Sequence, residues 1–99
     1  MQIVPVINVA SQTLTITLGG QSCRINLKTR STGLYCDLYV NDALVIGGVA
    51  CRNLKRIVID SYLGFAGDLM FSDTQGADDP SSPGLGSRFL LFYLEAGDL

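Results

Sequence analysis

The chain has 99 residues, of which 47% are hydrophobic and 16% are charged, and its formal net charge is −2. This length suits a single β domain (1–99) and leaves no room for two independent cores. The composition lacks the basic stripe of a nucleic-acid-binding domain, and no run reaches the ~20 apolar residues of a membrane helix. The opening MQIVPVINVA has no positive start, so we expect a soluble cytoplasmic product without a signal peptide.

The low charged fraction carries a first functional inference. It lies below the usual share of roughly 25%, although a small domain has a large surface to cover. Apolar side chains are therefore expected on the outside of the isolated chain, as in a subunit of an assembly. The alternative is a tight β core that needs many Val, Ile and Leu residues.

Two hairpins are predicted in the first half of the chain. Apolar residues alternate with polar ones in SQTLTITL (11–18) and SCRINLK (22–28), on either side of Gly19-Gly20. The alternation is typical of strands with one buried face, and the glycine pair predicts a hairpin turn. LYCDLYV (34–40) and ALVIGGVAC (43–51) flank Asn41-Asp42 in the same way. The glycine pair in ALVIGGVAC predicts a bulge or a close backbone approach.

Three further runs complete the predicted fold: IVIDSYLGF (57–65), GDLMFSD (67–73) and RFLLFYLE (88–95). The last is apolar on both faces, which favours a strand that is central or covered on both sides. Turn signals recur roughly every 8 to 12 residues and no helical period is convincing, so the expected class is all-β. We predict a small antiparallel β-barrel or β-sandwich with one long Gly/Pro/Asp-rich loop. The predicted core residues, by shared phase, are Leu14, Ile16, Ile25, Leu27, Leu38, Val40 and Leu69.

Catalytic and metal chemistry find little support. The chain has no histidine and no C-x-x-C pair, so zinc is not expected, and no cofactor is predicted. Cys23, Cys36 and Cys51 are predicted to be reduced core residues. A carboxylate pair could hydrolyse glycosides, but a β domain of this size rarely supplies the deep cleft, so no enzyme is expected. The carboxylates considered for such a pair are Asp60, Asp68 and Asp73.

The loop at 73–87, DTQGADDPSSPGLGS, holds three aspartates and two prolines. Its spacing is not that of an EF-hand, so a calcium site is a minor alternative to an acidic loop that faces solvent or a partner. We expect the loop to recognise a partner and to add little buried area. Alternatively, Arg88 pins the loop by bonding its carboxylates. The candidate partner-contact residues are Asp73, Gln75, Asp78, Asp79, Leu85 and Arg88 here, with Tyr35 and Tyr39 on an outward strand face.

The two tyrosines allow a second interpretation. They share their face with cations of the preceding strand, an arrangement that can stack single-stranded nucleic acid. Ordinary cross-strand pairing is favoured instead, because Asp37 between the tyrosines would pair with the cations and repel phosphate. No nucleic-acid partner and no membrane partner are therefore expected.

Four blocks carry a resemblance that covers nearly the whole chain: TLGGQSCRINL, STGLYCDLYVND, YLGFAGDLMFSDTQGADDP and GLGSRFLLFYLE. In this order they resemble the baseplate plug family of contractile-tailed phages and prophages. The resemblance implies a structural plug or adaptor in the central hub and tube region of a tail baseplate. It implies hub and tube partners, the tape measure as a further candidate, a homo-oligomer within the assembly, and a place in the virion after assembly in the host cytoplasm. The alternative is a small prophage-encoded β-fold module that binds a ligand or protein and has no virion role.

Overall fold

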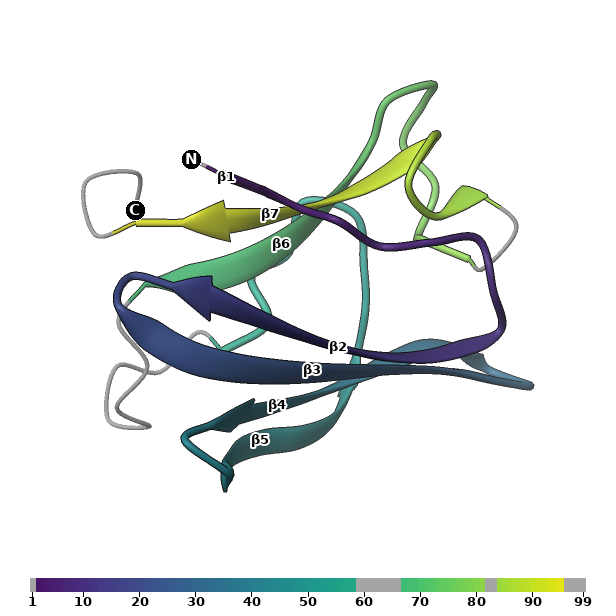
Figure 1. Cartoon of the computed structure of the whole chain (residues 1–99). Coiled ribbons are helices and arrows are strands. Elements are labelled where there is room, and N and C mark those ends of the chain that lie inside the picture. The colour runs from purple at the N-terminus through teal and green to yellow at the C-terminus, as the bar shows by residue number, and fades with distance from the viewer. Residues whose placement is uncertain (1, 59–66, 82–83, 96–99) are drawn as a thin grey trace.

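The computed structural model describes residues 2–58, 67–81 and 84–95, and shows two antiparallel β-sheets lying over one another (Figure 1). The strands are β1 Gln2–Val4, β2 Ser11–Leu18, β3 Gln21–Arg30, β4 Gly33–Val40, β5 Ala43–Ala50, β6 Asp68–Asp73 and β7 Phe89–Leu94. One sheet has the order β1-β7-β6 and the other β2-β3-β4-β5. The all-β prediction is confirmed, and the arrangement is sandwich-like, not a closed barrel.

The four-stranded sheet forms as its sequence pattern predicts. β2 pairs with β3 in an unbroken register from Ser11↔Lys28 to Leu18↔Gln21. The turn residues Gly19 and Gly20 both have positive φ, as a two-residue hairpin turn requires. Asn41 and Asp42 also have positive φ, at 50° and 65°. The predicted bulge is present in β5, where the register against β4 shifts.

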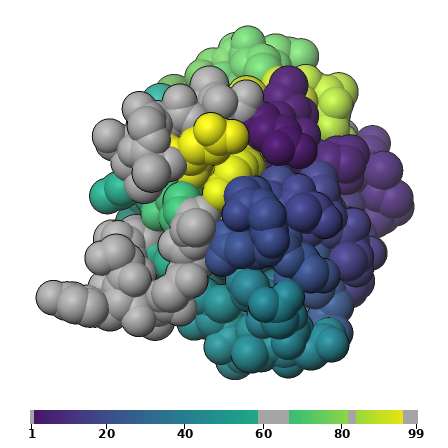
Figure 2. All heavy atoms as spheres, turned by 60° about the vertical axis from the view of Figure 1, so that its left-hand side comes forward, coloured from purple at the N-terminus to yellow at the C-terminus, as the bar shows by residue number. Residues whose placement is uncertain are grey.

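The three-stranded sheet joins segments that are far apart in the chain. β1 pairs with β7 from Gln2↔Tyr93 to Val4↔Leu91, and β7 pairs with β6 on its other side. The central position predicted for RFLLFYLE is therefore correct, whereas β1 was not predicted. In Figure 2 the purple spheres of the first strand lie beside the yellow spheres of the last one. Most of the run predicted at 57–65 lies outside the described residues.

The core fills the space between the two sheets. Its largest fully buried side chains include Tyr93 and Phe71 from one sheet, with Leu18, Ile25 and Leu38 from the other.

Most of the predicted core is confirmed, because Ile25, Leu27, Leu38 and Leu69 are at most 1% exposed. Leu14, Ile16 and Val40 are only partly buried. The first two lie on β2, an edge strand with a neighbour on one side only, and Val40 ends β4 at a turn. No helix in the described part of the chain is long and apolar enough to cross a membrane.

Candidate functional site

An ion pair between a buried carboxylate and a partly exposed guanidinium closes the base of the long loop between β6 and β7. Asp73 is the last residue of β6 and its side chain is 0% exposed. Its carboxylate accepts hydrogen bonds from Nε and Nη2 of Arg88, both at 2.9 Å. The backbone N–H groups of Gln75 and Asp78 donate to the same carboxylate, each at 2.9 Å. The bidentate pair with Arg88 and the two backbone amide bonds together engage both carboxylate oxygens of Asp73. The loop is therefore fixed where it leaves the sheet.

The electrostatics of this clamp follow from its geometry. The hydrogen bonds that Arg88 donates to Asp73 hold the pKa of the Asp73 carboxyl well below its ordinary value, and the same bonds raise the pKa of Arg88. Arg88 also donates to Asp78 at 2.8 Å, so one guanidinium serves two carboxylates. The alternative prediction, that Arg88 pins the loop internally, is what the structure shows.

A second set of contacts ties the loop to the segment before β6. Asp79 accepts hydrogen bonds from the backbone N–H of Asn53 at 3.0 Å and from Arg52 Nη1 at 3.3 Å. The side-chain oxygen of Asn53 in turn accepts from the backbone N–H of Asp73 at 2.9 Å. The tip of the loop and the 52–54 turn are therefore held side by side.

The second half of the loop packs against the sandwich. Leu85 is 2% exposed and Pro80 is buried. Gly86 has φ +83°, and a Cβ there would collide with the carbonyl oxygen of Val6. Residues 74–79 are exposed, so the burial that the loop adds is confined to a few positions. Polar composition did not reveal that a single leucine and a proline anchor it.

The candidate contact residues divide by exposure. Asp73 and Leu85 are buried inside the chain, and their side chains serve the fold. Gln75 is exposed, and the side chains of Asp78 and Asp79 are 76% and 54% exposed. Arg88, at 34%, is engaged by both Asp73 and Asp78.

Leu54 is a feature that sequence reasoning missed. It is 62% exposed and has a φ of 57°, an uncommon combination because a branched side chain is strained in the left-handed region. Backbone strain of this kind is often found at functional sites. Leu54 follows Asn53 directly, so it lies next to the acidic tip of the loop. We call Leu54, Gln75, Asp78 and Asp79 the loop–turn surface.

The outward face with the tyrosines is an internally paired network. The Arg24 guanidinium lies 4.3 Å from the centroid of the Tyr39 ring and 3.2 Å from an oxygen of Asp42. Lys28 Nζ lies 3.7 Å from Asp37 Oδ2. The favoured cross-strand interpretation fits this geometry, since both cations already have carboxylate partners.

Other arrangements considered for chemistry do not assemble. Asp68 and Asp73 begin and end β6, which separates them by roughly 17 Å, too far for a glycosidase pair. Asp68 is buried and accepts from the backbone N–H groups of Val58 and Leu69 at 2.8 and 2.7 Å. Asp60 lies outside the described residues. Within 2–58, 67–81 and 84–95, no three His, Cys, Asp or Glu side chains form a potential metal site.

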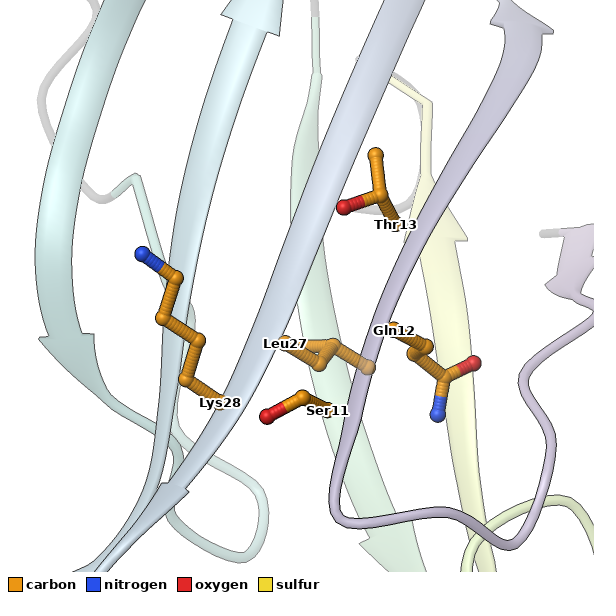
Figure 3. Close-up of a pocket in the computed structure, with 5 residues that line it drawn as sticks. All are labelled: Ser11, Gln12, Thr13, Leu27 and Lys28. Atoms are coloured by element: carbon orange, nitrogen blue, oxygen red, sulfur yellow. The ribbon is translucent and has the colours of Figure 1, made fainter.

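A surface pocket of about 280 Å³ lies at the start of the β2–β3 hairpin (Figure 3). Ser11, Gln12, Thr13, Leu27 and Lys28 line it. Figure 3 shows Lys28 and Gln12 extending to opposite sides of the hairpin. The lining holds hydroxyls, an amide and an amine, without a carboxylate, so it brings no acid–base pair together.

The exposed apolar side chains agree with the composition. Among the residues that the structure describes, five large hydrophobic side chains remain exposed: Ile3, Ile7, Val9, Leu44 and Leu54. The expected apolar surface of the isolated chain is therefore present, and three of the five lie in its first nine residues. All three cysteines are buried and unpaired, as predicted.

Comparison with known proteins agrees with the sequence resemblance. No curated protein matches the chain. A family model described as the cyanophage baseplate Pam3 plug gp18 matches residues 1–96. The match spans both sheets and the clamped loop, and it confirms the resemblance to a phage baseplate plug family. The chain therefore belongs to the family of the cyanophage baseplate Pam3 plug gp18.

Proposed function

We propose that this chain is a structural component of a contractile phage tail baseplate, and that it acts as a plug or adaptor in the central hub and tube region. The observation that carries the proposal is the family match over residues 1–96. In this proposal residues 1–99 act as one β domain without enzymatic activity. The chain joins hub and tube proteins, and in some arrangements the tape measure, during assembly in the host cytoplasm, and it remains in the virion.

The loop–turn surface is the proposed contact with these partners. It combines an exposed leucine with exposed carboxylates and an amide, on a backbone that is already ordered by the Asp73–Arg88 clamp. A preordered loop loses little conformational entropy on docking, which favours recognition. Asp78 and Asp79 each bond one arginine of the chain itself, but their side chains stay 76% and 54% exposed, which suits a partner surface that carries cations. Tyr35 and Tyr39 on β4 are a second proposed contact. This contact lies on the outward face of a sheet, whereas the loop–turn surface is formed by a loop and a turn.

The test is the fate of the chain in a strain that produces the corresponding tails. A tagged copy is followed through density-gradient purification and a high-salt wash that strips loosely attached proteins. We expect a fixed ratio of the chain to tail proteins, and defective tails from a strain that lacks it. A chain that remains entirely in the soluble fraction, beside complete and infective tails, would overturn the proposal in favour of a binding module without a virion role.

A further inference from the structure

Among the described strands, the two sheets have four edge strands, and three of these are protected against pairing with another strand. β1 is only three residues long and is followed by Pro5. β5 carries two register shifts against β4, one at Gly47-Gly48 and one at Val45. The edge of β6 is covered by the 53–57 segment, through hydrogen bonds from Leu54 N to Phe71 O and from Ile57 N to Leu69 O. Short length, proline, bulges and covering segments are the usual devices that prevent edge-to-edge association.

Among the described residues, β2 lacks these devices along most of its length, and only its start is bonded to a neighbouring segment, through the Gln12 side chain and the backbone of Ile7. Its eight residues, SQTLTITL, include no charge, no proline and no glycine, and its register with β3 has no shift. Within the described residues, β3 is its only neighbour in the sheet. In Figure 2 the blue spheres of this hairpin lie at the surface, below the purple N-terminal strand. In the described part of the chain, β2 is therefore an open edge with a regular register.

The register shows which backbone groups face outward from this edge. The Thr29 N–H donates to the Ala10 carbonyl at 2.9 Å, one step beyond the Ser11↔Lys28 pair. Because hydrogen-bonded and non-hydrogen-bonded pairs alternate along an antiparallel ladder, the even-numbered residues of β2 bond to β3. The residues whose N–H and C=O groups point away from β3 are then Ser11, Thr13, Thr15 and Thr17.

We propose that β2 pairs antiparallel with β2 of a second copy of this chain, about a twofold axis at Thr15. In this register Thr15 lies opposite its own copy and Thr13 opposite Thr17, so that the outward groups form about six hydrogen bonds. On the inner face Leu14 lies opposite Ile16 of the second copy. These two side chains are only partly buried in one copy, and the added strand covers them.

A second copy is the occupant that fits best, for two reasons. The strand carries no charge, so self-pairing sets no like charges directly opposite one another. Each copy also has a single open edge among the described strands. When the open edges of two copies pair, neither copy has an open edge left. Association therefore stops at a dimer with a self-complementary interface. The inference does not depend on the proposed baseplate role, because its test uses the isolated full-length chain.

The register is tested with single cysteines in a chain whose own three cysteines are buried. With oxidised glutathione as the oxidant, Thr15→Cys should form a covalent dimer, because the opposed Cα atoms lie about 5.5 Å apart, within disulfide range. Thr13→Cys and Thr17→Cys alone should remain uncrosslinked, and a mixture of the two should crosslink. Equal crosslinking of all single variants, or none with Thr15→Cys, would overturn the proposed pairing.

Two further variants test the interface without a thiol. Thr15→Pro removes an N–H that points to the open edge and no β2–β3 hydrogen bond, so the fold should survive while the dimer is lost. Thr15→Lys should raise the dimer dissociation constant by roughly tenfold or more, through charge repulsion across the axis. Thr15→Val keeps the shape and the N–H, and serves as the matched control. Analytical ultracentrifugation over a concentration series should give a dimer for the native chain and for Thr15→Val. A native chain that stays monomeric, or a Thr15→Pro variant that stays dimeric, would overturn the proposal.

Discussion

Replacing Leu54 by glycine should separate the stability of the chain from its assembly. Leu54 has a φ of 57°, and the left-handed conformation costs a residue with a Cβ roughly 1–2 kcal/mol. Glycine removes that strain. It also makes the unfolded chain more flexible, which lowers stability by roughly 0.5–1 kcal/mol.

The lost packing completes the balance for the isolated chain. Full burial of a leucine is worth about 1.5–3 kcal/mol, and Leu54 is 62% exposed, so only about 0.6–1.1 kcal/mol of burial is at stake. The gain and the two losses nearly cancel. We expect the free energy of unfolding of Leu54→Gly to stay within about 1 kcal/mol of the native value.

Assembly should respond differently if Leu54 is buried against a partner. The 62% of its surface that is exposed in the isolated chain would then contribute about 1–2 kcal/mol to the contact. Its removal should weaken the contact about five- to thirtyfold. Leu44→Ala is the matched control, because Leu44 is 59% exposed but lies on β5, away from the loop–turn surface.

The assay compares thermal melting of each purified variant with its incorporation into tail particles, in competition with the native chain. Leu54→Gly should melt within about 8 °C of the native chain and be depleted from particles, whereas Leu44→Ala should incorporate normally. Normal incorporation of Leu54→Gly would show that Leu54 is not a contact. A larger fall in Tm would show that the strain at this residue has been overestimated.

Three further predictions concern the folded chain. The depressed pKa of Asp73 gives a stabilisation that is present above the unfolded value of about 3.9 and is lost as pH falls through the folded pKa. Asp73→Asn should therefore have a lower free energy of unfolding at neutral pH. In urea titrations at a series of pH values, its loss of stability on acidification should be smaller than that of the native chain. An equal dependence of stability on pH in the two chains would contradict the Arg88 clamp. Gly86→Ala should lose about 1–3 kcal/mol and clearly more than Gly20→Ala, since both have positive φ but only Gly86 meets a close backbone atom; equal melting shifts would contradict this packing. The pKa of the Cys36 thiol is raised by a hydrogen bond with Cys51 and by burial. Ellman's reagent should therefore label Cys36 only after unfolding. Labelling of Cys36 in the native chain would contradict its burial.

The sequence by itself determined the local elements and their inward faces. Period-two alternation in SQTLTITL and LYCDLYV, with Gly19-Gly20 and Asn41-Asp42 between runs, predicts hairpins whose strands agree closely with β2 to β5. Such elements are readable because the residues that pair are neighbours in the chain and the turn chemistry sets the register. The apolar surface of the isolated chain was likewise visible in the composition.

Only the tertiary structure decided which strands are edges and which loop residues are buried. β1 exists because Gln2–Val4 meets β7 some ninety residues later in the chain, and three residues carry too little pattern to predict a strand. Leu14 and Ile16 alternate as core residues do, yet the order of strands leaves them at an edge. Asp73 and Arg88 form a clamp only because β6 and β7 are adjacent. Alternation reports which face of a strand is apolar, but the neighbours of that strand are set by packing between distant segments, and the exposed contacts of this chain depend on those neighbours.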